Sequence, residues 1–246
     1  MFESYPLVFL AWLIGGFVNG VSGMGAAMVA LPIMVCVMDM SVAVPASCFT
    51  ALVVATQVAW MYRKSCRYAS LPFMLVGCLP GVVGGVLILR IIPGIWLQAL
   101  LGVALMAYVV WQYLHRKSPG HPESRTGAFL SGFGSGFANA SISFSGPPVA
   151  MYALYVGWDK DSARGTLGMF FLCINIITCL VMAGAGLFTA EVLHAALYGM
   201  PGAVAGLLAS LPFVHAIKEQ VFQRILLIMI ALAGMICIVR SAETVL

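Results

Sequence analysis

The apolar residues of this chain are gathered into eight long stretches, which are separated by short polar breaks. The stretches cover residues 5–38, 43–62, 71–92, 95–114, 127–157, 165–190, 192–214 and 221–239. A helix rises about 1.5 Å per residue, so one bilayer crossing takes about 20 residues. Six of the stretches fit one membrane-spanning helix each, and we predict an all-α polytopic membrane protein.

The first and fifth stretches are too long for one crossing, and glycine and polar residues interrupt both of them. In the first stretch, GVSGMG at 20–25 separates arms at 5–19 and 26–38. In the fifth, the interruption is NASISFSGPP at 139–148. Lipid cannot satisfy the N–H and C=O groups that a broken helix frees. We therefore expect each stretch to be a re-entrant hairpin whose tip lies near the midplane.

The two halves of the chain resemble each other. With an offset of 116 residues, Gly16, Gly20, Pro32 and Thr50 fall on Gly132, Gly136, Pro148 and Thr166. With an offset of 121, PGVVGG at 80–85 falls on PGAVAG at 201–206. We interpret this as a duplication, a common plan of secondary transporters. The predicted units are a first repeat (1–114), a linker (115–126) and a second repeat (127–246).

Lysine and arginine residues indicate how the repeats are oriented. If every stretch crossed the membrane once, the 12 basic residues would divide seven against five. If the first and fifth stretches return as hairpins, ten gather on one side, and only Arg90 and Arg240 remain on the other. The positive-inside rule favours the second arrangement. Each half then crosses an odd number of times, so we predict inverted repeats with a cytoplasmic 115–126 linker.

Composition restricts the classes of function. Hydrophobic residues make up 62% of the chain and charged residues 8%, whereas a soluble domain has about 25% charged residues. The net charge of +4 comes from residues that flank apolar segments, so we expect a lipid bilayer and no nucleic acid as partner. The seven cysteines and four histidines are dispersed, and we expect no metal and no cofactor. No catalytic nucleophile or charged pair lies at depth in the predicted spans, so we do not expect an enzyme. The sequence leaves open whether the protein forms a homo-oligomer.

The two tips carry small hydrogen-bonding residues, and each returning arm begins with free backbone N–H groups. Helix N-termini of this kind bind anions, as broken helices do in several transporters. No tip residue is charged, so a small anionic substrate can bind and also leave. The candidate substrate-binding residues are Asn19, Gly20, Ser22, Gly23, Gly25, Thr50, Asn139, Ser141, Ser143, Ser145, Gly146 and Thr166.

Some of these residues also fit a packing role. Glycines spaced by four residues allow close helix contact, and we favour packing for Gly16/Gly20, Gly77/Gly81/Gly85, Gly132/Gly136 and Gly202/Gly206. Thr50 and Gln57, with their counterparts Thr166 and Asn175, could line the same cavity, but each fits an ordinary interhelical hydrogen bond better. We expect Arg164 to attract anions at the cytoplasmic mouth. Span centres carry no Asp, Glu or His, so no proton relay is expected.

Several segments resemble the sulfite exporter TauE/SafE family. They are GFVNGVSGMGAAMVALP at 16–32, GSGFANASISFSGPPVAMYAL at 134–154, KDSARGTL at 160–167 and the two PG segments. The resemblance implies a permease that moves sulfite, organosulfonates such as sulfoacetate or related anions across the bacterial inner (cytoplasmic) membrane. Two alternatives stay open, namely a permease for a non-sulfur organic anion and a non-transporting membrane assembly subunit.

Overall fold

The structure, a computed structural model, describes residues 5–114, 120–213 and 219–245. Within these residues every regular element is helical. The helices are α1 (Tyr5–Ser22), α2 (Ala26–Met34), α3 (Met40–Tyr62), α4 (Leu71–Ile91), α5 (Gly94–Leu114), α6 (Arg125–Ile142), α7 (Gly146–Val156), α8 (Lys160–Gly184), α9 (Ala190–Ser210) and α10 (Glu219–Val245). Short 3-10 helices lie at Arg63–Ser65 and Leu211–Phe213.

The predicted all-α membrane architecture is confirmed. Among the described residues, six segments are long and apolar enough to cross a membrane, namely Tyr5–Ser22, Met40–Ser65, Leu71–Ile91, Gly94–Leu114, Asp161–Gly184 and Ala190–Phe213. They are not the same six as predicted, because Tyr5–Ser22 belongs to the first predicted hairpin and α10 contributes only the shorter apolar segment Leu226–Ala242. Helices α3, α4 and α5 begin and end within three residues of the spans predicted at 43–62, 71–92 and 95–114. Helix α9 ends before the predicted boundary, which lies outside the described residues, and α10 extends past both predicted ends.

Helix α8 differs most from its predicted span, which covered residues 165–190. It begins directly after Asp159, whose carboxylate accepts a hydrogen bond from the Ser162 N–H (3.1 Å) and caps the helix. It ends at Gly184, shortly before Gly186, whose φ of 72° does not fit a right-handed helix. Hydropathy alone missed both ends because a cap and a glycine turn set them.

Each of the two long stretches folds as two helices joined by a sharp turn. Residues 23–25 separate α1 from α2, and residues 143–145 separate α6 from α7. We call these turns tip one and tip two. In the first hairpin the two helices approach so closely that a Cβ on Gly15 would lie 2.6 Å from the Ala26 carbonyl oxygen. The predicted interruptions are therefore present in both halves.

The helices of the two halves correspond in a register of 120 residues at the hairpins. Helices α6, α7 and α8 begin at 125, 146 and 160, and their counterparts α1, α2 and α3 begin at 5, 26 and 40. The offset of 116 between the glycine motifs differs from this by about one helical turn. Small residues recur every four positions on α1 and on α6. An alignment of the two halves that is displaced by one helical turn therefore still matches glycine with glycine. The structural register pairs Asn19 with Asn139, Gly23 with Ser143 and Gly25 with Ser145.

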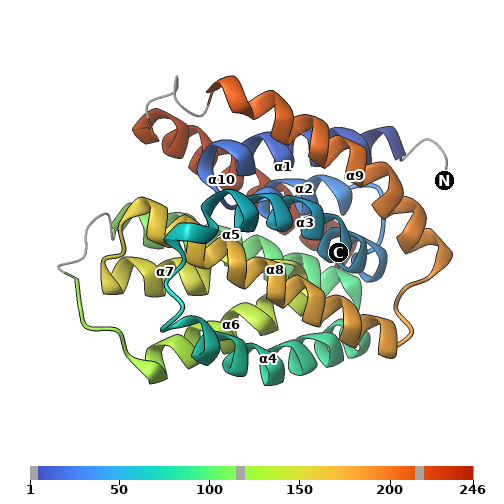
Figure 1. Cartoon of the computed structure of the whole chain (residues 1–246). Coiled ribbons are helices and arrows are strands. Elements are labelled where there is room, and N and C mark those ends of the chain that lie inside the picture. Colours follow the sequence, from blue (N-terminus) through green and yellow to red (C-terminus); the bar gives the residue numbers. More distant parts are fainter. Residues whose placement is uncertain (1–4, 115–119, 214–218, 246) are drawn as a thin grey trace.

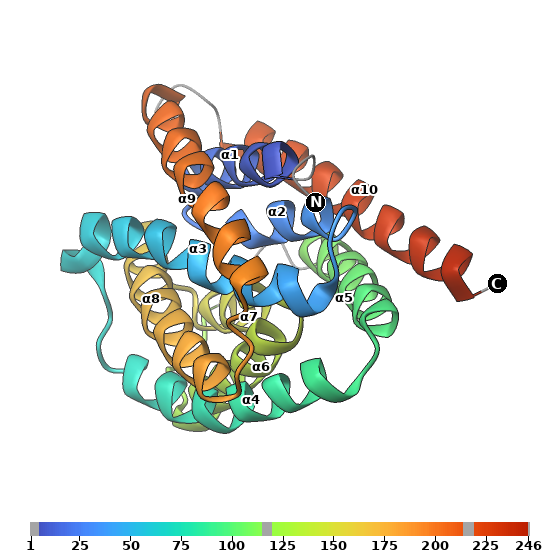
Figure 2. The ribbon, with the colours of Figure 1, turned by 90° about the vertical axis from the view of Figure 1, so that its right-hand side faces the viewer.

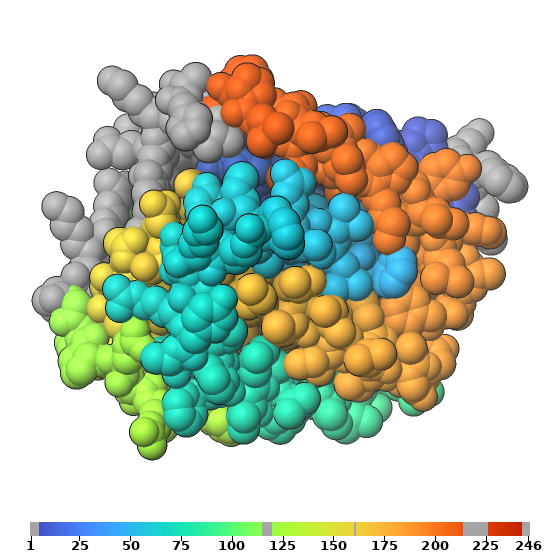
Figure 3. All heavy atoms as spheres, in the orientation of Figure 1, coloured from blue at the N-terminus to red at the C-terminus, as the bar shows by residue number. Residues whose placement is uncertain are grey.

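Each half packs its fourth helix on the first arm of the other half. Helix α4 lies along α6 and α9 lies along α1, while α3 packs on α8 and α5 packs on α10. The α1–α9 and α4–α6 pairs lie on opposite sides of the molecule, with α3 and α8 between them (Figures 1 and 2). At the surface, blue-green helices of the first half lie directly against yellow and orange helices of the second (Figure 3). If each helix is replaced by its counterpart in the other half, the α4–α6 pair becomes the α9–α1 pair, and the α3–α8 and α5–α10 pairs are unchanged. A duplicated chain is expected to have this symmetry of contacts.

Glycine makes the closest of these contacts possible. A Cβ on Gly81 of α4 would overlap the carbonyl oxygen of Phe133 on α6. A Cβ on Gly206 of α9 would overlap the carbonyl oxygen of Leu13 on α1. The other glycines of the four-residue patterns are similarly close to a neighbouring helix, namely Gly16, Gly20, Gly77, Gly85, Gly132, Gly136 and Gly202. Their predicted packing role is confirmed.

We expect Gly81→Ala to destabilise the protein, because the new methyl group forces α4 away from the α6 backbone. Gly84→Ala is the matched control on the same helix. A Cβ there meets only the Phe137 ring, at 3.5 Å. Thermal denaturation in detergent should show a lower Tm for Gly81→Ala and an unchanged or higher Tm for Gly84→Ala. Equal Tm values for the two variants would contradict the packing argument.

A polar cluster joins three loops at one end of the molecule. Arg67, which follows α3, forms ion pairs with Glu123 (3.4 Å) and Asp159 (3.7 Å). The Glu123 carboxylate also accepts hydrogen bonds from the Ser70 hydroxyl (2.7 Å) and the Trp158 indole N–H (3.1 Å). The loop after α3, the residues before α6 and the turn after α7 therefore lie together. The Ser70 hydrogen bond, helped by those from Trp158 and Arg67, holds the pKa of Glu123 below its ordinary value.

We expect Glu123→Gln to lower the free energy of unfolding by about 1 kcal/mol at neutral pH. The folded-state pKa is the lower one, so the contribution is complete above the unfolded pKa of about 4.3. It is lost as the pH falls through the folded value. Denaturation of both proteins at a series of pH values should therefore show a difference that disappears in acid. A difference that does not depend on pH would contradict this account.

Candidate functional site

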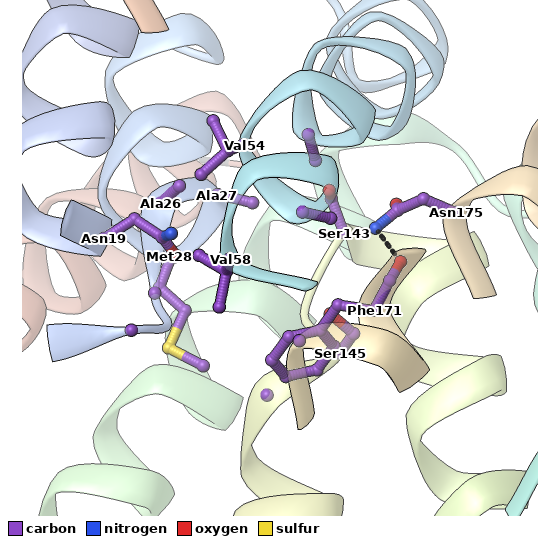
Figure 4. Close-up of a pocket in the computed structure, with 16 residues that line it drawn as sticks. Asn19, Ala26, Ala27, Met28, Val54, Val58, Ser143, Ser145, Phe171 and Asn175 are labelled. Carbon is purple, nitrogen blue, oxygen red and sulfur yellow. Dashed lines mark hydrogen bonds between the residues drawn. The ribbon is translucent and has the colours of Figure 1, made fainter. Parts of the chain in front are cut away.

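A cavity lies between the two tips, and helices α3 and α8 complete its walls. Its volume is about 50 Å3. One water needs roughly 10–15 Å3, so the cavity accommodates a few waters or one compact anion. The lining residues are Asn19, Gly23, Gly25, Ala26, Ala27, Met28, Ala51, Val54, Ala55, Val58, Ser143, Ser145, Gly146, Gly168, Phe171 and Asn175. Asn19, Ala26 and Met28 face Ser143 and Ser145 across it (Figure 4).

Tip one requires glycine at two positions. Gly23 has a φ of 82° and Gly25 a φ of 97°, values that residues with a side chain rarely adopt. The Ser22 hydroxyl donates a hydrogen bond to the Val18 carbonyl oxygen (2.8 Å) and is also bonded to the Met24 backbone. That hydroxyl stabilises the turn, and the structure places Ser22 outside the cavity lining.

Helix α2 begins at the cavity wall with its first N–H groups uncapped. Gly25 precedes the helix and has no side chain that could accept a hydrogen bond from them. The first three residues of α2, Ala26, Ala27 and Met28, all line the cavity. The N–H groups of a first helical turn have no acceptor within the helix and form the positive end of its dipole. The cavity therefore has a set of backbone donors on this side.

Tip two presents hydroxyl groups in place of most of these amides. Ser143 adopts a left-handed conformation with a φ of 49°, and Ser145 directly precedes α7. Both serines line the cavity together with Gly146. The next two residues of α7 are Pro147 and Pro148, which have no N–H. The donors on this side are mainly the two serine hydroxyls.

Two asparagines add carboxamide groups to the lining. Asn19 lines the cavity and is only 6% exposed. The Asn175 side chain donates to the Phe171 carbonyl oxygen (2.8 Å), as Figure 4 shows. Its oxygen accepts from the Asn139 side chain (3.4 Å), which also donates to the Thr178 hydroxyl (3.0 Å). Asn139 therefore lies behind the cavity and orients Asn175.

Six of the twelve candidate residues line the cavity, namely Asn19, Gly23, Gly25, Ser143, Ser145 and Gly146. The structure places the other six elsewhere: Gly20, Ser22, Thr50, Asn139, Ser141 and Thr166. Thr50 and Ser141 donate to the carbonyl oxygens four residues earlier in their own helices, at 2.9 Å and 2.7 Å. Gly20 packs against α9, and Thr166 accepts a hydrogen bond from the Arg67 N–H (2.9 Å).

The lining residues that the sequence did not indicate are mostly apolar. On α3 they recur at the spacing of one helix face, as Ala51, Val54, Ala55 and Val58. On α8, the one lining residue with a polar side chain is Asn175, which the sequence did indicate as a possible lining residue. No lining residue is charged. In the described segments, no group of three or more His, Cys, Asp or Glu side chains is placed to hold a metal ion.

Comparison with known proteins gives one result that covers nearly the whole chain. The profile of a family described as sulfite exporter TauE/SafE matches residues 8–236. No curated protein and no solved structure matches significantly. The matched region includes both tips and every residue that lines the cavity. The chain therefore belongs to the sulfite exporter TauE/SafE family of multi-pass membrane permeases.

Proposed function

We propose that this chain moves sulfite, or a small organosulfonate such as sulfoacetate, out of a bacterial cell across the cytoplasmic membrane. The anion binds in the cavity between tip one and tip two. The observation that carries the proposal is the donor set of that cavity. It combines the uncapped amides that begin α2, the hydroxyls of Ser143 and Ser145, and the carboxamides of Asn19 and Asn175.

A donor set without charge suits an anion that must bind and leave. The oxygens of sulfite accept hydrogen bonds, and aligned N–H and O–H groups stabilise negative charge where water is scarce. A fixed cation at this depth would be costly and would hold the anion too firmly for transport.

The membrane potential supplies the driving force for export. Moving one negative charge outward is favourable by about 2.3 kcal/mol per 100 mV when the cell interior is negative. No carboxylate or imidazole lines the cavity. The proposed transport therefore proceeds without proton transfer by a lining side chain, in the direction that potential and gradient set.

Contacts at the ends of the helices support the predicted two-hairpin topology. Arg67 contacts Glu123 and Asp159, and all three lie in segments that this topology assigns to the cytoplasmic side. If every stretch crossed once, Asp159 would lie on the opposite side of the bilayer from Arg67. Arg240 donates a hydrogen bond to the Cys36 carbonyl oxygen (2.8 Å), and both residues belong to the predicted outer side.

We expect Ser145→Ala to raise the KM for sulfite about tenfold, because a hydrogen bond to a charged group contributes about 1.5 kcal/mol. Ser141→Ala is the matched control, since the Ser141 hydroxyl donates to the Phe137 carbonyl oxygen and does not line the cavity. The measurement is sulfite flux in proteoliposomes under an imposed potential, with sulfate and acetate as competing anions. Absence of potential-dependent sulfite flux in the wild type would refute the proposed function. Equal KM values for the two variants would move the binding site elsewhere.

We expect a reporter inserted at Gly120 to be cytoplasmic. Gly120 lies in the loop that carries Glu123, on the side where ten of the 12 basic residues gather in the predicted topology. A matched insertion at Pro93, between α4 and α5, should read as external. An external signal at Gly120 would reverse the proposed orientation.

A further inference from the structure

A tyrosine and an arginine lie just beyond one end of the cavity. On α3 the lining ends at Val58, and Tyr62 follows one turn later. On α8 the lining ends at Gly168, and Arg164 precedes it by one turn. The two helices are in contact there, since a Cβ on Gly165 would lie 2.6 Å from the Tyr62 carbonyl oxygen. This end of the cavity is the one nearest the loop after α3.

The Arg164 side chain joins three elements at this position. It donates one hydrogen bond to the Tyr62 hydroxyl (3.2 Å) and another to the Val21 carbonyl oxygen in the last turn of α1 (3.1 Å). Its Cγ and Nε lie 3.0 Å and 3.3 Å from where a Cβ on Gly23 would be. Gly23 belongs to tip one and lines the cavity. Arg164 therefore ties tip one to α3 and α8.

The partners of the Arg164 guanidinium are neutral. In the described part of the chain, the ion pairs of carboxylates are those of Arg67, and none involves Arg164. The negative end of the α1 dipole at Val21 compensates its charge only in part. A charge-assisted hydrogen bond to an anion is about twice as strong as one between neutral groups. An anion that reaches Arg164 is therefore a better partner for the guanidinium than the groups that hold it.

Among the described residues, tip two has no such tie. Val44 occupies the position on α3 that corresponds to Arg164 in the 120-residue register, and it is buried. Near tip two, the Ser143 hydroxyl lies 3.9 Å from the Cys48 thiol on α3. The arginine bridge is thus present on tip one and absent from tip two.

We propose that Arg164 is a latch that closes the cavity toward the end where α3 finishes, and that an arriving anion opens it. In the latched state the guanidinium holds tip one against Tyr62. When an anion takes over the hydrogen bonds of the guanidinium, Val21 and Tyr62 are released and tip one is free to move. Arg164 is a positioning residue in this scheme, which rests on the proposed anion transport.

The test measures access to the cavity separately from transport. A cysteine introduced by Val58→Cys is labelled with a membrane-impermeant thiol reagent from each face in turn, with the same protein lacking this change as background. Arg164→Gln removes the positive charge and the two hydrogen bonds to Tyr62 and Val21. Arg164→Lys keeps the positive charge, but the single ammonium group cannot bridge both acceptors as the guanidinium does. Tyr62→Phe removes one acceptor with little change in shape. Arg63→Gln is the matched control, because Arg63 lies over the Trp60 ring (4.0 Å) at the same end.

We expect labelling from the cytoplasmic face to rise on the order of tenfold in the Arg164 and Tyr62 variants, because each loses at least one hydrogen bond of the latch. Labelling from the outer face and in Arg63→Gln should not change. Unchanged labelling in folded Arg164→Gln and Tyr62→Phe would overturn the latch. A wild-type sulfite KM in Arg164→Lys, combined with wild-type labelling, would show that Arg164 only attracts anions. Failure of the wild type to move sulfite would instead refute the proposed function, which the labelling does not measure.

Discussion

A helix that stops inside a bilayer must find protein partners for its freed backbone groups, because lipid offers none. In the proposed two-hairpin topology, two helices of this protein stop in that way, at tip one and tip two. Helix α1 packs on α9 and helix α6 packs on α4, and in both pairs the two backbones come into contact at glycine positions. Each first arm is thereby packed on a helix of the opposite half. Residues of both tips line one cavity.

Hydropathy predicted most of the fold because the cost of polar groups in lipid dominates the choice of spans. It indicated the interrupted stretches and the close glycine contacts. It did not give the ends of α8, which depend on the Asp159 cap and the Gly186 turn. The register between the halves was displaced by one turn, because a glycine face with a four-residue period matches itself after such a shift. Only the positions at which the helices begin show that the offset between the halves is 120 residues and not 116.

The site was harder to predict for a physical reason. A serine in a membrane helix can donate to a carbonyl oxygen of its own helix when no water is available. The Ser141 hydroxyl does so, and the Ser22 hydroxyl supports its own turn. Polarity alone therefore does not tell whether a hydroxyl faces a cavity. The backbone donors of α2 belong to residues such as Ala26 and Ala27, whose side chains carry no chemical signal.

The two tips also differ in mechanical freedom. Tip one turns on Gly23 and Gly25, whose backbones have the widest choice of conformations. Tip two leads directly into Pro147 and Pro148, where the rings fix two successive φ angles. The first hairpin therefore has a flexible turn, whereas the turn of the second hairpin is rigid. In the proposed transport cycle, the first hairpin moves against the second one, so the inward-facing and outward-facing states are not related by the symmetry of the two halves.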